Sequence, residues 1–361
     1  MNTNYILSNL GFKESFKILA NDFPHLYPGR VTEQARETYK VATEEGEIVA
    51  EVSGKFRYES IDVSDFPIVG DFVLLDRLND ENGNAQIQHL LERESELARR
   101  ASGASNERQL MAANIDKVLI CMSVNEDFNI ARAERYLTLA WNSGATPVFV
   151  LTKTDISNEL DSKLAQLEEI SFGVDILLTN TVEKDGYLSL LKYIKDNETV
   201  VLIGSSGVGK SSLVNALLGN KFLKTNGLRN DGKGKHTTTQ RKLFKISSGG
   251  IIIDTPGIRE VGLNSVNLID TFSDIYDLAL YCKFKDCTHG NEPGCAIQNA
   301  IEKGNLSRKR FFNFQKLERE ASYEGLNNKT IERNKLDRMF KNVGGLKKAR
   351  KTLKKQNKRS Y

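Results

Sequence analysis

The chain has 361 residues, of which 39% are hydrophobic and 27% are charged, with a formal net charge of +4. A chain of this length and apolar content is expected to hold two or three domains with real cores. No apolar run is long enough to span a membrane, and the N-terminus lacks the pattern of a secretion signal. We therefore expect a cytoplasmic protein with no membrane partner. We also expect a monomer.

Residues 1–28 have the pattern of a short helical lead-in, in which no chemical motif stands out. From residue 29 to 100 the sequence resembles β-structure, with about five short strands separated by polar turns. This fits a small β-barrel of the OB-fold type, which often binds single-stranded nucleic acid. One strand beginning at Gly54 would present basic and aromatic side chains on the barrel: Lys55, Phe56, Arg57 and Tyr58. A barrel that serves only to dock another protein fits equally well.

Residues 99–108, RRASGASNER, are interpreted as a basic and flexible linker. Beyond it, apolar strands alternate with helices up to residue 277. The strands are expected at 117–122, 147–151, 174–178 and 200–203, and the helices at 131–141, 159–170, 186–194 and 212–218. This alternation predicts an α/β domain over 101–277, with a mostly parallel sheet between helices.

A glycine-rich loop follows the apolar run 200–203 and has the spacing of a phosphate-binding P-loop. Its glycines let successive backbone N–H groups face one anion, and the next helix points its N-terminus at the same phosphates. Lys210 is expected to reach the β- and γ-phosphates, and the Ser211 hydroxyl to bind Mg²⁺. The predicted contacts are Gly204, Ser205, Ser206, Gly207, Val208, Gly209, Lys210, Ser211 and Ser212.

A second loop, directly after the strand at 147–151, contains Thr152, Lys153, Thr154 and Asp155. A T-K-x-D tetrapeptide at a strand end is similar to the base-reading loop of GTP-binding proteins. The Asp155 carboxylate can accept hydrogen bonds from N1–H and the 2-amino group of guanine, neither of which adenine offers. These four residues are therefore predicted to bind the base of GTP.

Two further segments have the features of nucleotide-sensing switches. Residues 225–239 are polar and glycine-broken and end in H-T-T-T, where Thr238 is expected to join Mg²⁺ when the triphosphate is present. An apolar run at 250–253 then leads into D-T-P-G. There Asp254 would hold Mg²⁺ through water, and the Gly257 N–H would meet the γ-phosphate. Because the base-reading loop precedes the P-loop and D-x-x-G comes last, the GTPase domain is predicted to be circularly permuted.

Three of the four cysteines lie close together, with the spacing Cys282-x4-Cys287-x-His289-x5-Cys295. Three thiolates and one imidazole form a closed tetrahedral set for a structural Zn²⁺ ion. Helices are expected after it at 308–322 and 330–356, so we predict an α-helical zinc-binding domain over 278–361. A domain this small would depend on the metal for much of its stability.

The last part of the chain is basic and has no acidic residue after Asp337. A basic run is often only a solvated tail, but beside a zinc module and a barrel suited to nucleic acid, contact with RNA phosphates is favoured. The residues concerned are Lys347, Lys348, Arg350, Lys351, Lys354, Lys355, Lys358 and Arg359.

The order T-K-x-D, P-loop, H-T-T-T, D-T-P-G and cysteine cluster resembles the ribosome small-subunit-dependent GTPase A family over residues 30–345. The resemblance implies an OB-fold, a permuted GTPase domain and a zinc domain. It also implies hydrolysis of GTP to GDP and phosphate, stimulated by the small (30S) ribosomal subunit and its rRNA during late maturation. The chain departs from the family pattern at Thr152, where asparagine is usual, and at Asn180 in the last base loop.

The residue that positions the attacking water is not evident from the motifs. Ile258 follows D-x-x-G, where many GTPases carry a glutamine that orients water. Lys210, Asp254 and Thr238 would supply charge neutralisation, and His236 is our candidate to orient or deprotonate the water. Because few residues separate D-x-x-G from Cys282, a shift of this switch with the γ-phosphate would move the zinc domain. The nucleotide state is therefore predicted to set the relative orientation of the zinc and OB domains, so that GTP favours subunit binding and hydrolysis favours release.

Two other functions fit parts of the sequence. A P-loop ATPase or small-molecule kinase would share the phosphate loop, but Asp155 argues against adenine. A constitutive RNA-binding protein with a weak or degenerate nucleotide site is the main alternative. The intact Lys210, Ser211 and Asp254 argue against it.

Overall fold

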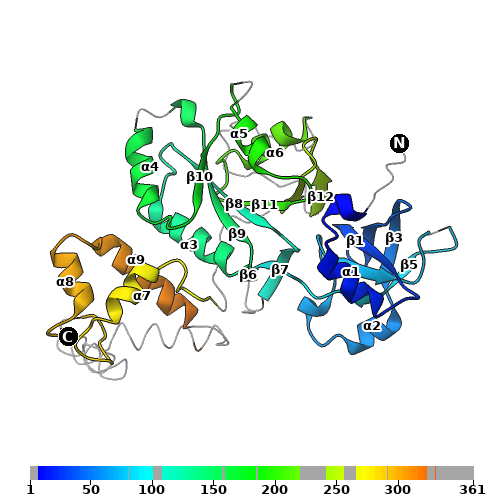
Figure 1. Ribbon diagram of the computed structural model, residues 1–361, viewed down its shortest axis with the longest axis horizontal. Coiled ribbons are helices and arrows are strands. Elements are labelled where there is room, and N and C mark those ends of the chain that lie inside the picture. The colour runs from blue at the N-terminus through cyan, green and yellow to red at the C-terminus, as the bar shows by residue number, and fades with distance from the viewer. Residues whose placement is uncertain are drawn as a thin grey trace, which may run out of the picture.

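The structure is a computed structural model. It describes residues 7–79, 81–100, 108–156, 159–183, 186–219, 241–255, 266–290, 292–322 and 330. A β-barrel, a central sheet with flanking helices, and a small helical module lie in a row (Figure 1). Among the described helices, none has the length and apolar character that crossing a membrane requires.

The N-terminal lead-in is helical, as predicted, and packs on the outside of the barrel. A 3₁₀ helix, η1 (Leu7–Leu10), precedes the helix α1 (Glu14–Asn21). The buried side chains of Leu7, Phe12 and Phe16 form one apolar cluster with Phe72 and Leu74 of the barrel. This burial of aromatic surface is what holds the lead-in in place.

The barrel consists of β1 (Tyr27–Gln34), β2 (Thr38–Ala42), β3 (Glu47–Val52), β4 (Phe72–Leu75) and β5 (Ala85–Leu90). The strands are ordered β1-β2-β3-β5-β4, and β4 pairs back onto β1 to close the barrel. Alternate residues of β3 are buried, as a half-buried strand requires. The predicted five-stranded OB-fold barrel is confirmed.

One predicted strand of the barrel is wrong. Gly54–Glu59 forms the helix α2, so Lys55, Phe56, Arg57 and Tyr58 lie on a helix that leads toward the 3₁₀ helix η2 (Val63–Asp65). The Ser53 side chain accepts a hydrogen bond from the Phe56 backbone N–H at 3.1 Å. A serine at this position satisfies a backbone donor of the first turn, and this local cap starts the helix.

The predicted flexible linker is also wrong at both of its ends. Residues 99–100 lie in β6 (Glu96–Arg100), which pairs antiparallel with β7 (Arg108–Ala113). The intervening residues 101–107 lie outside the described ranges. Pairing between strands satisfies the backbone of these arginines, so the basic composition did not indicate a linker.

The central sheet has the strand order β10-β9-β8-β11-β13-β12. Its strands are β8 (Lys117–Ser123), β9 (Thr146–Thr152), β10 (Asp175–Leu178), β11 (Thr199–Ile203), β12 (Lys242–Lys245) and β13 (Ile251–Asp254). All neighbouring pairs are parallel except β12 with β13. The predicted mostly parallel sheet is confirmed.

Helices cover both faces of this sheet, as predicted. They are α3 (Ile130–Trp141), α4 (Leu160–Glu168), α5 (Leu188–Tyr193) and α6 (Lys210–Leu218). Alternate residues of β8 belong to two separate apolar cores: Val118 and Ile120 pack with α3 and α4, whereas Leu119 and Cys121 pack with α5 and α6. A strand buried on both faces reads as a continuous apolar run, which is why the sequence located it correctly.

The C-terminal module contains α7 (Ser273–Ala279), α8 (Ala296–Glu302) and α9 (Arg308–Ala321) around its own apolar cluster. It lies beside α3 of the central domain (Figure 1). The predicted helix at 308–322 is confirmed. The predicted helix at 330–356 and the basic residues from Lys347 onward lie outside the described ranges.

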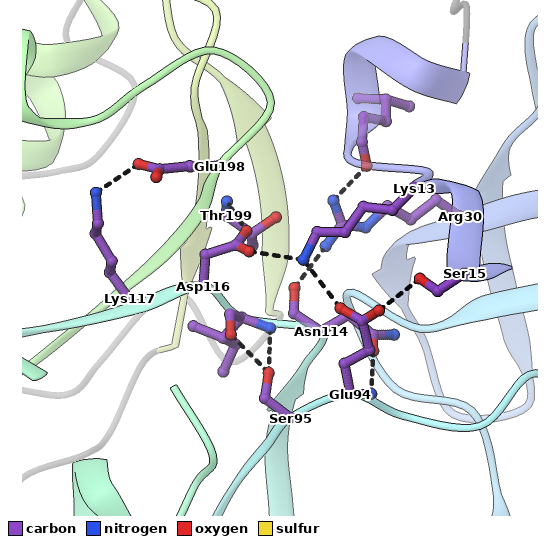
Figure 2. Close-up of polar contacts among 12 residues, drawn as sticks. Lys13, Ser15, Arg30, Glu94, Ser95, Asn114, Asp116, Lys117, Glu198 and Thr199 are labelled. Atoms are coloured by element: carbon purple, nitrogen blue, oxygen red, sulfur yellow. Dashed lines mark hydrogen bonds and ion pairs between the residues drawn. The ribbon is translucent and has the colours of Figure 1, made fainter. Parts of the chain in front are cut away.

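The lead-in, the barrel and the central sheet meet in one polar junction (Figure 2). Lys13 donates to Glu94 Oε2 and to Asp116 Oδ1, each at 2.9 Å. The fully buried Arg30 donates to the carbonyl oxygens of Leu10, Gly70 and Asn114. One guanidinium therefore joins all three parts of the chain.

Candidate nucleotide site and metal centre

The predicted P-loop connects β11 to α6 at the carboxyl end of the central parallel strands. Gly204, Gly207 and Gly209 have φ values of 143°, 80° and 101°. A Cβ on Gly204 would also collide with the carbonyl oxygen of Cys121 in the neighbouring strand β8. Only glycine tolerates both the left-handed backbone and this close approach. The N-cap residue of α6 is Gly209, which has no side chain to cap the helix, an arrangement suited to an anion.

The charged side chain of Lys210 lies within the loop, and Asp254 lies at the end of the neighbouring strand. Lys210 Nζ donates to the carbonyl oxygens of Gly204 at 2.7 Å and Ser205 at 2.6 Å, so the ammonium sits inside the loop. Ser211 is exposed on the first turn of α6. Asp254 ends β13, the parallel neighbour of β11. Burial raises the pKa of Asp254, an effect that the nearby Lys210 opposes.

The T-K-x-D loop contacts the P-loop directly. The Thr152 hydroxyl donates to the carbonyl oxygen of Val208 at 2.5 Å, and Lys153 Nζ donates to that of Gly207 at 2.8 Å. The two loops follow β9 and β11, which flank β8 at the same edge of the sheet. The structure therefore brings the two predicted halves of a nucleotide site together.

The other residues of the predicted base site differ in exposure. Asp155 is exposed, in the short 3₁₀ helix η3 (Thr154–Ile156), whereas the Thr154 hydroxyl donates to the Thr179 carbonyl at 3.2 Å. Asn180 is buried, and its Oδ1 accepts from the Val182 backbone N–H at 2.8 Å. Asn180 thus organises its own turn through its side chain.

Three of the predicted site residues, His236, Thr238 and Gly257, lie outside the described ranges. Sequence reasoning also missed a contact from α3 to the P-loop. Arg132 Nη1 donates to Ser205 Oγ at 2.5 Å and to Asp127 Oδ1 at 2.7 Å. Arg132 is an ordinary helix residue in the sequence, and only the pairing of strands β8 and β11 brings its helix beside the loop.

The predicted metal ligands come together in the C-terminal module. One donor atom from each of Cys282, Cys287, His289 and Cys295 lies within 4.8 Å of the others. Cys282 Sγ lies 3.9 Å from Cys295 Sγ and 3.5 Å from His289 Nδ1. Tetrahedral bonds of about 2.3 Å to sulfur imply sulfur separations of about 3.8 Å. The cluster can therefore hold a metal ion, and its dimensions fit zinc.

The chain is similar to a protein-family model and to named relatives. A model described as RsgA GTPase matches residues 90–264. A protein of Lactiplantibacillus plantarum, named small ribosomal subunit biogenesis GTPase RsgA 2, is 46% identical over 86% of this chain and 88% of its own length. A protein of the same name from Listeria monocytogenes is 44% identical over 89% of this chain and 91% of its own length.

Two solved structures are similar to this chain over most of its length. YjeQ from Thermotoga maritima is 29% identical with a TM-score of 0.61, over 81% of this chain and 97% of that one. YloQ, described as a circularly permuted GTPase, is 25% identical with a TM-score of 0.58, over 81% and 93% of the two chains. The predicted permuted order of the GTPase fold is confirmed. With its barrel, its P-loop sheet and its Cys₃His cluster, the chain belongs to the RsgA GTPase family.

Proposed function

We propose that this chain binds GTP between the P-loop and the T-K-x-D loop and that the small ribosomal subunit stimulates its hydrolysis during maturation of that subunit. The observation that carries the nucleotide site is the direct contact of the two loops through Thr152 and Lys153. The names of the relatives support the ribosomal partner, since they are called small ribosomal subunit biogenesis GTPases. GTP favours binding to the subunit, and hydrolysis favours release.

Each group of the site has a distinct task in this proposal. The P-loop amides and Lys210 hold the phosphates, and Ser211 with Thr238 would hold Mg²⁺, which neutralises phosphate charge. Asp254 ends the strand beside β11, and the charge of Lys210 opposes the rise in its pKa that burial causes. Asp155 recognises guanine, and Gly257 approaches the γ-phosphate. His236 positions the attacking water.

We further propose that the Cys₃His cluster holds zinc in a purely structural role. Four protein ligands complete a tetrahedron and leave no position for water, which is the arrangement of structural zinc sites. The corresponding division of the chain is a barrel over 29–100, a GTPase domain over 101–277 and a zinc-binding domain over 278–361. The basic tail of that last domain contacts rRNA phosphates.

The first experiment measures GTP and ATP turnover with and without purified small ribosomal subunits. We expect slow GTP turnover alone, a large rise with subunits and no ATP turnover. An unchanged GTP rate would remove the ribosomal partner and leave the nucleotide site standing. RNA binding without any GTP turnover would instead favour the constitutive RNA-binding protein.

A base-exchange variant tests the guanine contact itself. Asp155→Asn replaces an acceptor by an amide that can donate to the 2-oxo group of xanthine. We expect the preference to move from GTP toward xanthosine triphosphate, because an acceptor for the guanine 2-amino group is lost. Asp161→Asn, at an exposed acid in the first turn of α4, is the matched control. Unaltered GTP preference in Asp155→Asn would contradict the assignment.

A further inference from the structure

Helix α3 contacts both the P-loop and the C-terminal module. At its N-terminal end, Arg132 donates to Ser205 Oγ. One turn later, the buried Tyr136 also hydrogen-bonds with Ser205. The hydroxyl of a single P-loop residue is therefore held between two side chains of one helix.

Helix α3 also contacts the C-terminal module, through charged side chains. Glu134 Oε1 accepts from Arg310 Nη1 at 2.6 Å, and the exposed fractions of the two side chains are 1% and 7%. Arg310 of α9 also makes two hydrogen bonds, at 2.8 and 2.7 Å, with the carboxylate of Asp274 in α7. Asn313 of α9 donates to Glu134 as well. One buried carboxylate on α3 thus anchors two residues of α9.

Two further polar pairs extend this interface along α3. Arg135 makes a bidentate pair with Glu320 of α9, at 2.6 and 2.8 Å. Beyond the C-terminal end of α3, Asn142 and the backbone of Asn267 exchange two hydrogen bonds of 2.7 Å. The module is therefore docked on α3 by specific polar contacts.

An interface of this kind is sensitive to small displacements. Buried ion pairs offset their desolvation only when geometry and hydrogen bonding are good, so a shift of one partner weakens them sharply. Arg132, Glu134 and Arg135 are neighbours in one helix. A movement of its first turn is therefore transmitted to the contacts with α9.

Ser205 is the point at which a nucleotide would disturb this arrangement. Its backbone carbonyl accepts from Lys210 Nζ at 2.6 Å, while its side chain is held by α3. A bound β- or γ-phosphate attracts the Lys210 ammonium and so competes with the Ser205 carbonyl for it. The two states of the P-loop then differ in how firmly Ser205 is held, which is the differential interaction that a conformational response requires.

We infer that α3 couples nucleotide occupancy of the P-loop to the docking of the C-terminal module, with Arg132 as the positioning residue. This inference rests on the proposed nucleotide site. It adds a second route to the module, separate from the covalent connection through residues 256–265. Because coupling between two sites is reciprocal, weakening the α3–α9 contacts must also change the affinity for nucleotide.

The test measures backbone hydrogen exchange in α9 of the full chain, without nucleotide, with GDP and with a non-hydrolysable GTP analogue. In the unmodified protein we expect the rate of hydrogen exchange in Arg308–Ala321 to change on nucleotide binding by about fivefold or more. A factor of about five is the lower end of the usual coupling between two sites. Arg132→Ala and Glu134→Gln should each remove this response, whereas Arg132→Lys should retain part of it.

Two comparisons separate coupling from simple loss of structure. Arg319 lies on α9 and its side chain donates to the Gln315 carbonyl of the same helix, so Arg319→Ala should keep the full response. Each variant is referenced to its own exchange without nucleotide, so a general loosening of α9 does not imitate the result. Ser205→Ala combined with Arg132→Ala should remove the response no further than Ser205→Ala alone does, since both substitutions break the contact of Arg132 with Ser205.

The possible failures are distinguishable. If the unmodified chain binds neither GDP nor the GTP analogue, the proposed function fails. If nucleotide binds and α9 exchange does not respond, or if Arg132→Ala responds fully, the coupling through α3 is overturned while the nucleotide site stands.

Discussion

At the scale of single residues, Thr152 accounts for a departure from the family pattern. Its hydroxyl spans the gap between the base-reading loop and the P-loop, with Val208 as acceptor at 2.5 Å and the Met122 carbonyl at 3.3 Å. The short side chain of Thr152 therefore makes the contact between the two loops, at a position where asparagine is usual in the family. The hydroxyl, rather than the size of the side chain, carries this contact.

The prediction from this contact compares two substitutions at one position. Thr152→Val keeps the shape and leaves the buried Val208 carbonyl without its donor, which costs about 1–3 kcal/mol. We expect GTP affinity to fall by about tenfold, equivalent to 1.4 kcal/mol. Thr152→Ser keeps the hydroxyl and should bind within about threefold of the original, a difference below that of one lost hydrogen bond. Equal affinities in a fluorescent-nucleotide titration would show that the contact is not used.

The site residues were predictable to an uneven extent. Gly204 to Ser211 and the T-K-x-D loop follow from local sequence, because a phosphate loop and a base loop each need fixed residue types at fixed spacing. The contact of Arg132 with Ser205 was not predictable. Nothing in the sequence near Arg132 differs from a solvated helix face, and the contact depends on which strands are neighbours.

At the scale of elements, correct and wrong predictions have separate physical reasons. Strands β8, β9 and β11 are buried on both faces and give uninterrupted apolar runs, so their positions were found. Helix α2 was mistaken for a strand because alternating residues 54–58 resemble a half-buried strand, while the cap at Ser53 decided the outcome. The β6–β7 hairpin was missed because its partners lie on either side of a polar segment.

The Cys₃His cluster gives a prediction for the C-terminal module. Cys295 both belongs to the cluster and caps α8, since its Sγ accepts from the Gln298 N–H at 3.5 Å. Cys295→Ser keeps a capping oxygen but loses a soft ligand, so we expect loss of bound zinc and unfolding of the module. Structural zinc sites contribute about 10–16 kcal/mol in small peptides, far more than one cap. Zinc content and proteolysis at 266–322 measure the effect.

The fourth cysteine supplies the control for this experiment. Cys121 is buried in β8, away from the cluster, and burial raises its pKa to about 12. Cys121→Ala should leave zinc content unchanged. If Cys295→Ser retains one zinc per chain, the ligand set is wrong.

At the scale of the whole molecule, the lead-in and the barrel are tied to the nucleotide-binding sheet by the junction in Figure 2. Asp116 accepts from Lys13 through one oxygen and from the Thr199 backbone N–H through the other, at 2.7 Å. Thr199 begins β11, the strand that ends at the P-loop. Nothing in the sequence indicates this junction, because its members are dispersed over more than 180 positions.

Two basic residues of the junction should differ strongly in their contribution. Arg30 is fully buried, and burial lowers its pKa to about 10. Arg30→Ala removes the donor to the buried carbonyl oxygens of Leu10 and Asn114 and one of two donors to that of Gly70, so we expect the free energy of unfolding to fall by at least about 3 kcal/mol. Lys13→Ala breaks only half-exposed ion pairs and should cost at most about 1 kcal/mol. Urea unfolding followed by circular dichroism measures both, and equal losses would contradict the argument.

Within the part of the chain that the structure describes, the barrel pairs with the central sheet at Glu33, opposite Lys242, and this pairing has a consequence for solubility. Strand β12 is the last strand of the central sheet on that side, and β1 covers it. An uncovered strand of this kind is a template on which another polypeptide can add by backbone hydrogen bonding. The barrel thus occupies the position that an aggregating neighbour would take, and Lys242 with Glu33 places an ion pair where such a neighbour would dock. The protection against intermolecular strand addition comes from a barrel of a type that often binds single-stranded nucleic acid.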